Sequence, residues 1–290
     1  MSKLAAVHGM RMPERSKTRL HGTWYRAINR GLAATAWGRA HPEALPGPED
    51  LDLVYWADLF RPRRSPRGAP KQLVSREDLK MAAYAFLRAT VRAADAASLW
   101  DERGEPFGPV ALLVNRMVTE SARYMNDGPI VNADPRYAPG AYFQIQARFE
   151  EQLEKGPRVV IGHSLGSVIA YEGLCLNPHD VDTFITVGSP MATPQLIREP
   201  MLKRLNRRLN RAHDAPAPWP GVRRWVNFYA PADVWSVPIE RLARVMHPDI
   251  VDVEVRHGDP RRFVETHKLT AYLEHAELCE EIARALEACA

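Results

Sequence analysis

"RVVIGHSLGSVIAYEGL", residues 158–174, places a short β-branched run before Gly-His-Ser-Leu-Gly and an apolar run of small residues after it. This order predicts a buried strand, a sharp turn and a helix. A turn that tight leaves little room beside the backbone, so the residues two before and two after its apex must lack bulk. Gly162 and Gly166 meet this requirement, and Ser164 is the residue expected at the apex.

Five further apolar runs resemble the one before Gly162 in length and in their content of β-branched and aromatic residues. Few of these runs alternate with polar residues, as is typical of parallel strands that helices cover on both faces. The predicted fold class is therefore α/β, a mostly parallel, doubly wound sheet of about six strands. The expected strands are 3–7, 52–56, 158–162, 183–188, 225–230 and 250–255.

The length of 290 residues and a hydrophobic content of 46% suffice for one large core, so residues 1–290 are expected to form a single domain. Residues 61–156 are too long for one crossover connection and predict a helical insertion or cap, with helical patterns near 76–99, 109–125 and 140–155. Residues 190–224 form a second irregular stretch and are a candidate lid.

Within the candidate lid, residues 201–211 predict a helix with Leu202, Leu205 and Leu209 on one face and basic residues elsewhere. The basic face is either solvated or part of a lid that contacts anionic lipid at a membrane surface. Nucleic acid is not expected as a partner, because the net charge is only +4 and aromatic residues are not interleaved with Lys and Arg.

The three cysteines, Cys175, Cys279 and Cys289, are odd in number and far apart, which argues against a disulfide framework. The first residues lack the apolar core of a signal peptide, and no later stretch reaches the roughly 18 apolar residues needed to span a bilayer. A soluble, cytoplasmic protein is expected. The histidines show no metal-ligand spacing, so neither a metal nor a cofactor is expected.

The predicted turn has a chemical use, because a serine hydroxyl is a good nucleophile only when it stands clear of the backbone, near a base and near oxyanion donors. A Gly-x-Ser-x-Gly pattern between strand and helix resembles the nucleophile elbow of the α/β-hydrolase superfamily, in particular its serine esterases and lipases. The resemblance implies that the N–H of Leu165 is an oxyanion donor. The alternative is that Ser164 only caps a helix. Ser167 lies inside the predicted helix, where close packing explains a small residue.

The resemblance extends to His8-Gly9-Met10, which ends the first predicted strand. In α/β-hydrolases a second oxyanion N–H comes from such a turn, and here it would belong to Met10. The alternative is a simple glycine turn. Because the chain reaches this strand at once, it resembles the shortened core of cutinase-like and lipase-like members, and the resemblance does not cover residues 61–156.

The superfamily orders its triad as Ser, acid and His, each after a strand. Asp233 follows the run 225–230 and is the acid that the resemblance implies, the alternative being a turn-forming Asp. Two histidines follow the last strand. His267, ahead of the final helix, is preferred as the base over His257, which also fits an ordinary turn.

The expected function is cleavage of an acyl ester by a serine hydrolase, through an acyl-enzyme on Ser164. The substrate would be a small or lipid-like acyl compound. One alternative is an acyltransferase with the same triad. The other is a non-catalytic binding or interaction module on the hydrolase fold.

Overall fold

The computed structural model describes residues 3–10, 16–60, 121, 123–128, 130, 134, 136, 140–193, 197–233, 241–257 and 266–288. These residues contain six strands in one sheet, all parallel, in the order β2-β1-β3-β4-β5-β6. The predicted fold class and all six predicted strands are confirmed, with small shifts at their ends. The strands are β1 (Leu4–Val7), β2 (Leu51–Val54), β3 (Val159–His163), β4 (Thr183–Val187), β5 (Arg224–Tyr229) and β6 (Val251–Glu254).

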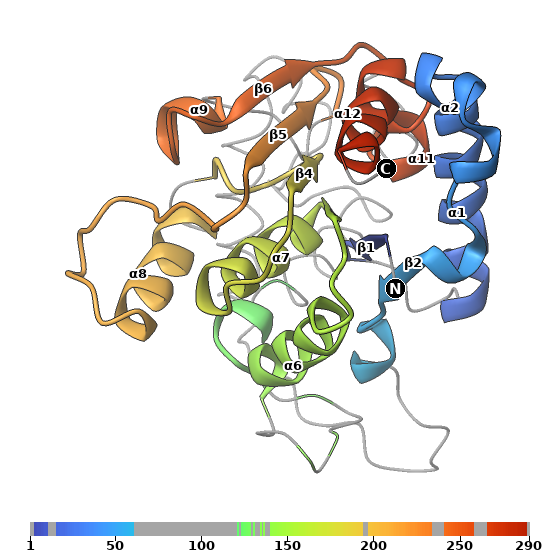
Figure 1. Ribbon diagram of the computed structural model, residues 1–290. Helices are drawn as coiled ribbons and strands as arrows, with labels where there is room; N and C mark the ends of the chain where they lie inside the picture. The colour runs from blue at the N-terminus through green and yellow to red at the C-terminus, as the bar shows by residue number, and fades with distance from the viewer. Residues whose placement is uncertain are drawn as a thin grey trace, which may run out of the picture.

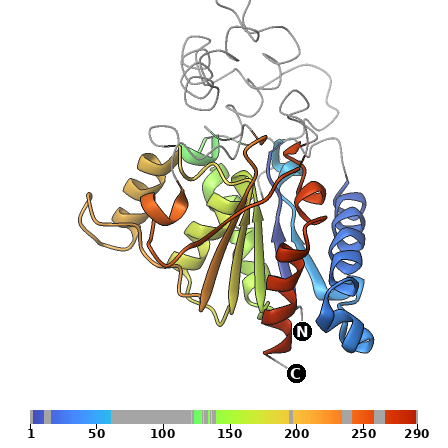
Figure 2. The same ribbon diagram turned by 90° about the horizontal axis from the view of Figure 1, so that it is seen from above.

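Helices cover both faces of this sheet (Figures 1 and 2). One layer consists of α1 (Lys17–Ala33), α2 (Ala36–Ala40), α11 (Leu269–Tyr272) and α12 (Ala276–Glu287), and the other of α6 (Ala141–Leu153), α7 (Leu165–Leu176) and α8 (Glu199–Arg208). A short helix, α9 (Leu242–Val245), contacts the edge strand β6. Three 3-10 turns, Pro42–Ala44, Pro48–Asp50 and Ala57–Phe60, complete the described elements.

Strand β1 shows why the apolar runs lack polar alternation. Its residues Leu4 and Ala6 pack in the core beneath α1 and α12, whereas Ala5 and Val7 pack in the core beneath α6 and α7. All four are buried. Because side chains of a strand alternate between faces, a sheet with two helical layers needs apolar residues at every position.

The strand order reverses beside β1. The chain passes from β1 to β2 on one side and then returns to place β3 on the other side of β1. In open α/β sheets such a reversal leaves a crevice at the carboxyl ends of the two strands, where ligands bind. The segments that begin there are His8-Gly9-Met10 and Ser164.

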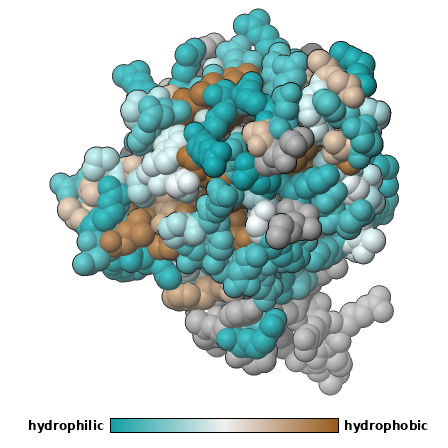
Figure 3. Space-filling view, in the orientation of Figure 1, coloured by the Kyte–Doolittle hydropathy of each residue, from teal (hydrophilic) through white to brown (hydrophobic). Residues whose placement is uncertain are grey.

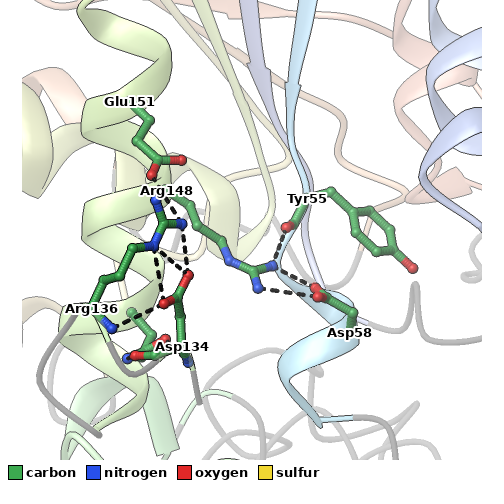
Figure 4. Close-up of polar contacts among 7 residues, drawn as sticks. Tyr55, Asp58, Asp134, Arg136, Arg148 and Glu151 are labelled. Carbon is green, nitrogen blue, oxygen red and sulfur yellow. Dashed lines mark hydrogen bonds and ion pairs between the residues drawn. The ribbon is translucent and has the colours of Figure 1, made fainter. Parts of the chain in front are cut away.

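Helix α6 lies within the range predicted as an insertion, yet it packs on α7, β1 and β2 and so belongs to the sheet's own helical layer. Arg148 of this helix donates to Asp58 at 2.5 Å and to the carbonyl oxygen of Tyr55 at 2.6 Å, just after β2 (Figure 4). Helix α6 is therefore a part of the sheet's own layer that the predicted range 61–156 had included. Residues 61–120, where most of the predicted cap falls, lie outside the described residues, and the cap stays a prediction.

Helix α8 lies in the range predicted as a lid, and it is anchored on α7. Leu205 is buried, as its predicted face requires. Arg204, one of the basic residues expected on the solvated or lipid-contacting face, instead points inward and donates to both carboxylate oxygens of Glu172 on α7, at 2.9 and 2.6 Å. The surface over this part of the chain mixes hydrophilic and hydrophobic residues (Figure 3). Contact of the remaining basic residues with lipid stays a prediction.

None of the helices within the described ranges combines the length and the apolar composition that crossing a membrane requires. The six parallel strands lie between two helical layers, with β1 and β3 side by side at the reversal, an arrangement consistent with the α/β-hydrolase fold.

Candidate active site

Ser164 occupies the apex of the turn between β3 and α7, with a φ of 55° and a ψ of −129°. A positive φ at a residue with a side chain costs of order 1–3 kcal/mol and persists only where its surroundings enforce it. Here the N–H of Ser164 donates to the carbonyl of Val187 at the end of β4, at 2.9 Å. The residue is 3% exposed.

Both glycines of the motif lie where a side chain would strike backbone. A Cβ on Gly162 would come within 2.5 Å of the Cα of Ser167, and a Cβ on Gly166 within 2.1 Å of the carbonyl oxygen of Val7. Because Gly162 has no Cβ, the helix can turn back over its own strand. Because Gly166 has none, the helix can pack closely on β1. The spacing therefore has the steric origin that the sequence indicated.

Gly9, after β1, lies against the serine itself. A Cβ there would be 2.5 Å from the Cβ of Ser164 and 3.0 Å from its Oγ. The backbone on either side of this contact carries the two amides assigned to the oxyanion site, those of Met10 and Leu165. The reversal of strand order thus brings the predicted nucleophile and both predicted donor segments together.

Asp233 and His267, the predicted acid and base, are hydrogen-bonded to each other. Asp233 follows β5 in a turn closed by its own N–H to the carbonyl of Ala230 at 2.9 Å, and it is fully buried. Nδ1 of His267 lies 3.0 and 2.9 Å from the two carboxylate oxygens. A carboxylate only accepts, so the proton of the neutral imidazole is on Nδ1 and the lone pair is on Nε2.

The imidazole of His267 lies beside the elbow. Nε2 of His163, the residue before the serine, donates to the carbonyl oxygen of His267 at 2.6 Å, and the two rings are 4.9 Å apart. Burial, and next the neighbouring His267, lower the pKa of His163 to about 3, so this ring is neutral. Gly188, with a φ of 57°, borders the same group, because a Cβ there would be 3.0 Å from Asp233 and 3.2 Å from His267.

The other candidate base, His257, is hydrogen-bonded to groups other than Asp233. Its Nδ1 is 2.9 Å from Nε2 of His275, and its Nε2 is 2.9 Å from the carbonyl oxygen of Thr266. Both nitrogens thus have partners away from the acid. His267 was expected just before the final helix. It lies before the short helix α11, and the final helix α12 follows α11.

Three polar residues of the site were not predicted from the sequence. Tyr272 on α11 donates its hydroxyl to Asp233 at 2.6 Å. Ser167 on α7 donates to the carbonyl oxygen of Ser164 at 2.6 Å and lies 2.7 Å from the hydroxyl of Ser189. No motif marks them, because each is defined by what the fold places opposite it.

Among the described residues, no cluster of three or more His, Cys, Asp or Glu has the arrangement of a metal site. Asp233 and His267 are hydrogen-bonded to each other beside the turn that carries the Ser164 hydroxyl, with backbone amides at hand. That combination is suited to attack by the hydroxyl on a carbonyl carbon and to stabilisation of the resulting oxyanion.

The fold and this set of groups resemble those of α/β-hydrolases. In agreement, the family model of the PGAP1-like alpha/beta domain matches residues 119–220, which include the elbow and end before Asp233 and His267. Among solved structures, the esterase domain of a Rhodothermus marinus protein is 21% identical, with a TM-score of 0.27, over 49% of this chain and 62% of that chain. The chain thus spans less than two thirds of that structure. No curated protein matches the chain.

Proposed function

We propose that this protein is a serine hydrolase that cleaves acyl esters through an acyl-enzyme on Ser164. The observation that carries the proposal is the strained elbow at Ser164 beside a His267–Asp233 hydrogen bond whose geometry leaves the imidazole lone pair on Nε2. Backbone strain of this kind is retained where function requires it. A helix N-cap alone would not require positive φ, since capping residues are typically extended.

In the proposed reaction, Nε2 of His267 takes the proton of Ser164 as Oγ forms a bond to the acyl carbon. The N–H groups of Met10 and Leu165 stabilise the oxyanion. His267 then returns the proton to the leaving oxygen, and the alcohol departs. Water, deprotonated by the same imidazole, attacks the acyl-enzyme and releases the carboxylic acid and the free serine. Asp233 holds the imidazole in one tautomer and stabilises its charged form.

The test is covalent labelling by a fluorophosphonate together with hydrolysis of nitrophenyl esters. We expect one label per wild-type chain and none in Ser164→Ala, with turnover lowered about 10³-fold or more because no nucleophile remains. Ser16→Ala is the matched control. It removes a hydroxyl that caps α1 by accepting from Arg19, and it should label and turn over as wild type does.

A wild-type chain that is neither labelled nor active contradicts this proposal and favours the binding module. Turnover that rises when an alcohol or amine acceptor is added, with transfer of the acyl group to it, favours the acyltransferase. A series of nitrophenyl esters of increasing acyl length defines the substrate class. Activity that grows with acyl-chain length supports the lipid-like substrate. We also propose that the reaction takes place in the cytoplasm.

A further inference from the structure

His8 has both ring nitrogens occupied in a way that fixes its tautomer. The ring is buried, and burial lowers its pKa to about 4, so the imidazole is neutral. Nε2 accepts the backbone N–H of Trp56 at 3.1 Å, so the single ring proton is on Nδ1, which donates to the carbonyl oxygen of Gly9 at 2.6 Å. The indole of Trp56 stacks on the ring and donates to the carbonyl oxygen of His8 at 3.0 Å.

The carbonyl of Gly9 shares a peptide plane with the N–H of Met10. In a planar trans peptide these two groups point in opposite directions, so a bond that fixes the oxygen also fixes the direction of the N–H. His8 therefore controls where the Met10 donor points.

The other amide is held in the same manner from α7. The hydroxyl of Ser167 lies 2.6 Å from the carbonyl oxygen of Ser164, and only the hydroxyl has a proton to share. The N–H of Ser167 donates to the same oxygen at 2.9 Å. Behind it, the hydroxyl of Ser189 lies 2.7 Å away and accepts the N–H of Met191 at 3.3 Å. Fixing the oxygen of Ser164 fixes the N–H of Leu165, which belongs to the same peptide.

We propose that His8 and Ser167 are positioning residues for the oxyanion site, each holding the carbonyl oxygen of the peptide whose N–H, on Met10 or Leu165, binds the oxyanion. The inference rests on the proposed function. It assigns one common task to two buried side chains, one just after β1 and one on α7. Neither side chain needs to touch the substrate.

The test for His8 distinguishes the effect of the hydrogen bond made by Nδ1 from that of the hydrogen bond made by Nε2. Asn puts an amide N–H close to the position of Nδ1, whereas Gln puts an amide oxygen close to that of Nε2. We expect His8→Asn to retain most of the turnover and His8→Gln to lower kcat about tenfold or more at unchanged KM, since the lost interaction acts only in the transition state. His21→Gln is the matched control. It replaces an imidazole whose Nε2 lies 2.8 Å from the carbonyl oxygen of Leu51, at the amino end of β2 and so at the other end of the strands from the site.

For Ser167, we expect Ser167→Ala to lower kcat about tenfold and Ser189→Ala to have a smaller effect, because the latter keeps the hydroxyl nearest the peptide. A trifluoromethyl ketone, which forms a charged tetrahedral adduct on serine, should bind more weakly to Ser167→Ala and His8→Gln by a similar factor. Binding of the product carboxylate should not change. Thermal unfolding of each variant separates these effects from loss of fold.

Equal rates for His8→Asn and His8→Gln overturn the assignment of His8, and ketone affinity unchanged in Ser167→Ala overturns that of Ser167. If wild type turns over and both variants match it, the inference fails while the proposed function stands. If wild type neither reacts with fluorophosphonate nor turns over, the proposed function fails and this inference fails with it.

Discussion

Gly9 lacks a side chain because Ser164 occupies the space that one would fill. A Cβ at this position meets the Cβ of Ser164 at 2.5 Å, and the nearest atoms belong to the strained elbow, which cannot move without displacing the hydroxyl. We expect Gly9→Ala to lower kcat/KM about 100-fold, measured on a nitrophenyl ester. An undiminished rate would mean that the elbow tolerates displacement.

Gly22 provides the matched substitution. It lies inside α1, where an added Cβ meets only the end of the Arg26 side chain, at 3.4 Å. Alanine is the better helix former by up to about 1 kcal/mol. Gly22→Ala should therefore raise the free energy of unfolding slightly and leave activity unchanged. That result would show that the loss of kcat/KM in Gly9→Ala arises from the position of Gly9 against Ser164.

For single residues, the sequence predicts those roles that depend on the conformation of the backbone. Ser164 and its flanking glycines could be found because a sharp turn restricts residue type at fixed spacing. Tyr272 and Ser167 could not be found, since a tyrosine or serine in a helix has many uses and only the fold brings these two to Asp233 and to the Ser164 carbonyl. That His267 would lie close to Asp233 was predicted only because each residue follows a strand, in the order in which the superfamily places its acid and its histidine.

Elements show a similar division between what a pattern determines and what packing determines. The strands were predicted well because double burial requires continuous apolar runs. Helix α6 was assigned to an insertion, because its pattern resembles that of any amphipathic helix and only its contacts with β1 and β2 identify its layer. Arg204 was predicted to lie on the basic face of its helix, because the sequence does not reveal that Glu172 is buried on α7 opposite this side chain and pairs with it.

The α7–α8 contact depends on that ion pair. Glu172 is fully buried and the Arg204 side chain is 10% exposed. Glu172 also accepts the hydroxyl of Tyr124 at 2.9 Å, and the guanidinium lies 4.3 Å from the ring centre of Tyr142. Removing one partner leaves the other charge buried, so we expect Glu172→Gln to lower the free energy of unfolding by about 3–5 kcal/mol in urea denaturation.

Replacing both partners, in Glu172→Gln with Arg204→Met, should cost less than the sum of the two single variants, because no charge is then left uncompensated. Glu281→Gln on α12 is the comparison. Its partner Arg224 forms an equally bidentate pair, but that side chain is 36% exposed, and the expected cost is about 1 kcal/mol or less. Equal losses at the two sites would contradict the role of burial.

For the molecule as a whole, the buried histidines of the site link stability to pH. His8 and His163 have pKa values of about 4 and about 3, both lowered chiefly by burial, whereas in the unfolded chain each titrates near 6.5. Between about pH 6.5 and pH 4 the unfolded state therefore binds more protons than the folded state. Stability rises with pH in this window and falls as the solution is acidified.

Each such group contributes a slope of about 1.4 kcal/mol per pH unit where the unfolded histidine is fully protonated. We expect the free energy of unfolding, from urea titrations at pH 4.5 to 7, to lose roughly half of the histidine-dependent slope in His163→Gln. This variant can keep the donor to the carbonyl oxygen of His267, so its fold should be retained at pH 7. A slope equal to that of wild type would mean that His163 binds a proton in the folded state and that the core of the site is more open to water than its packing implies.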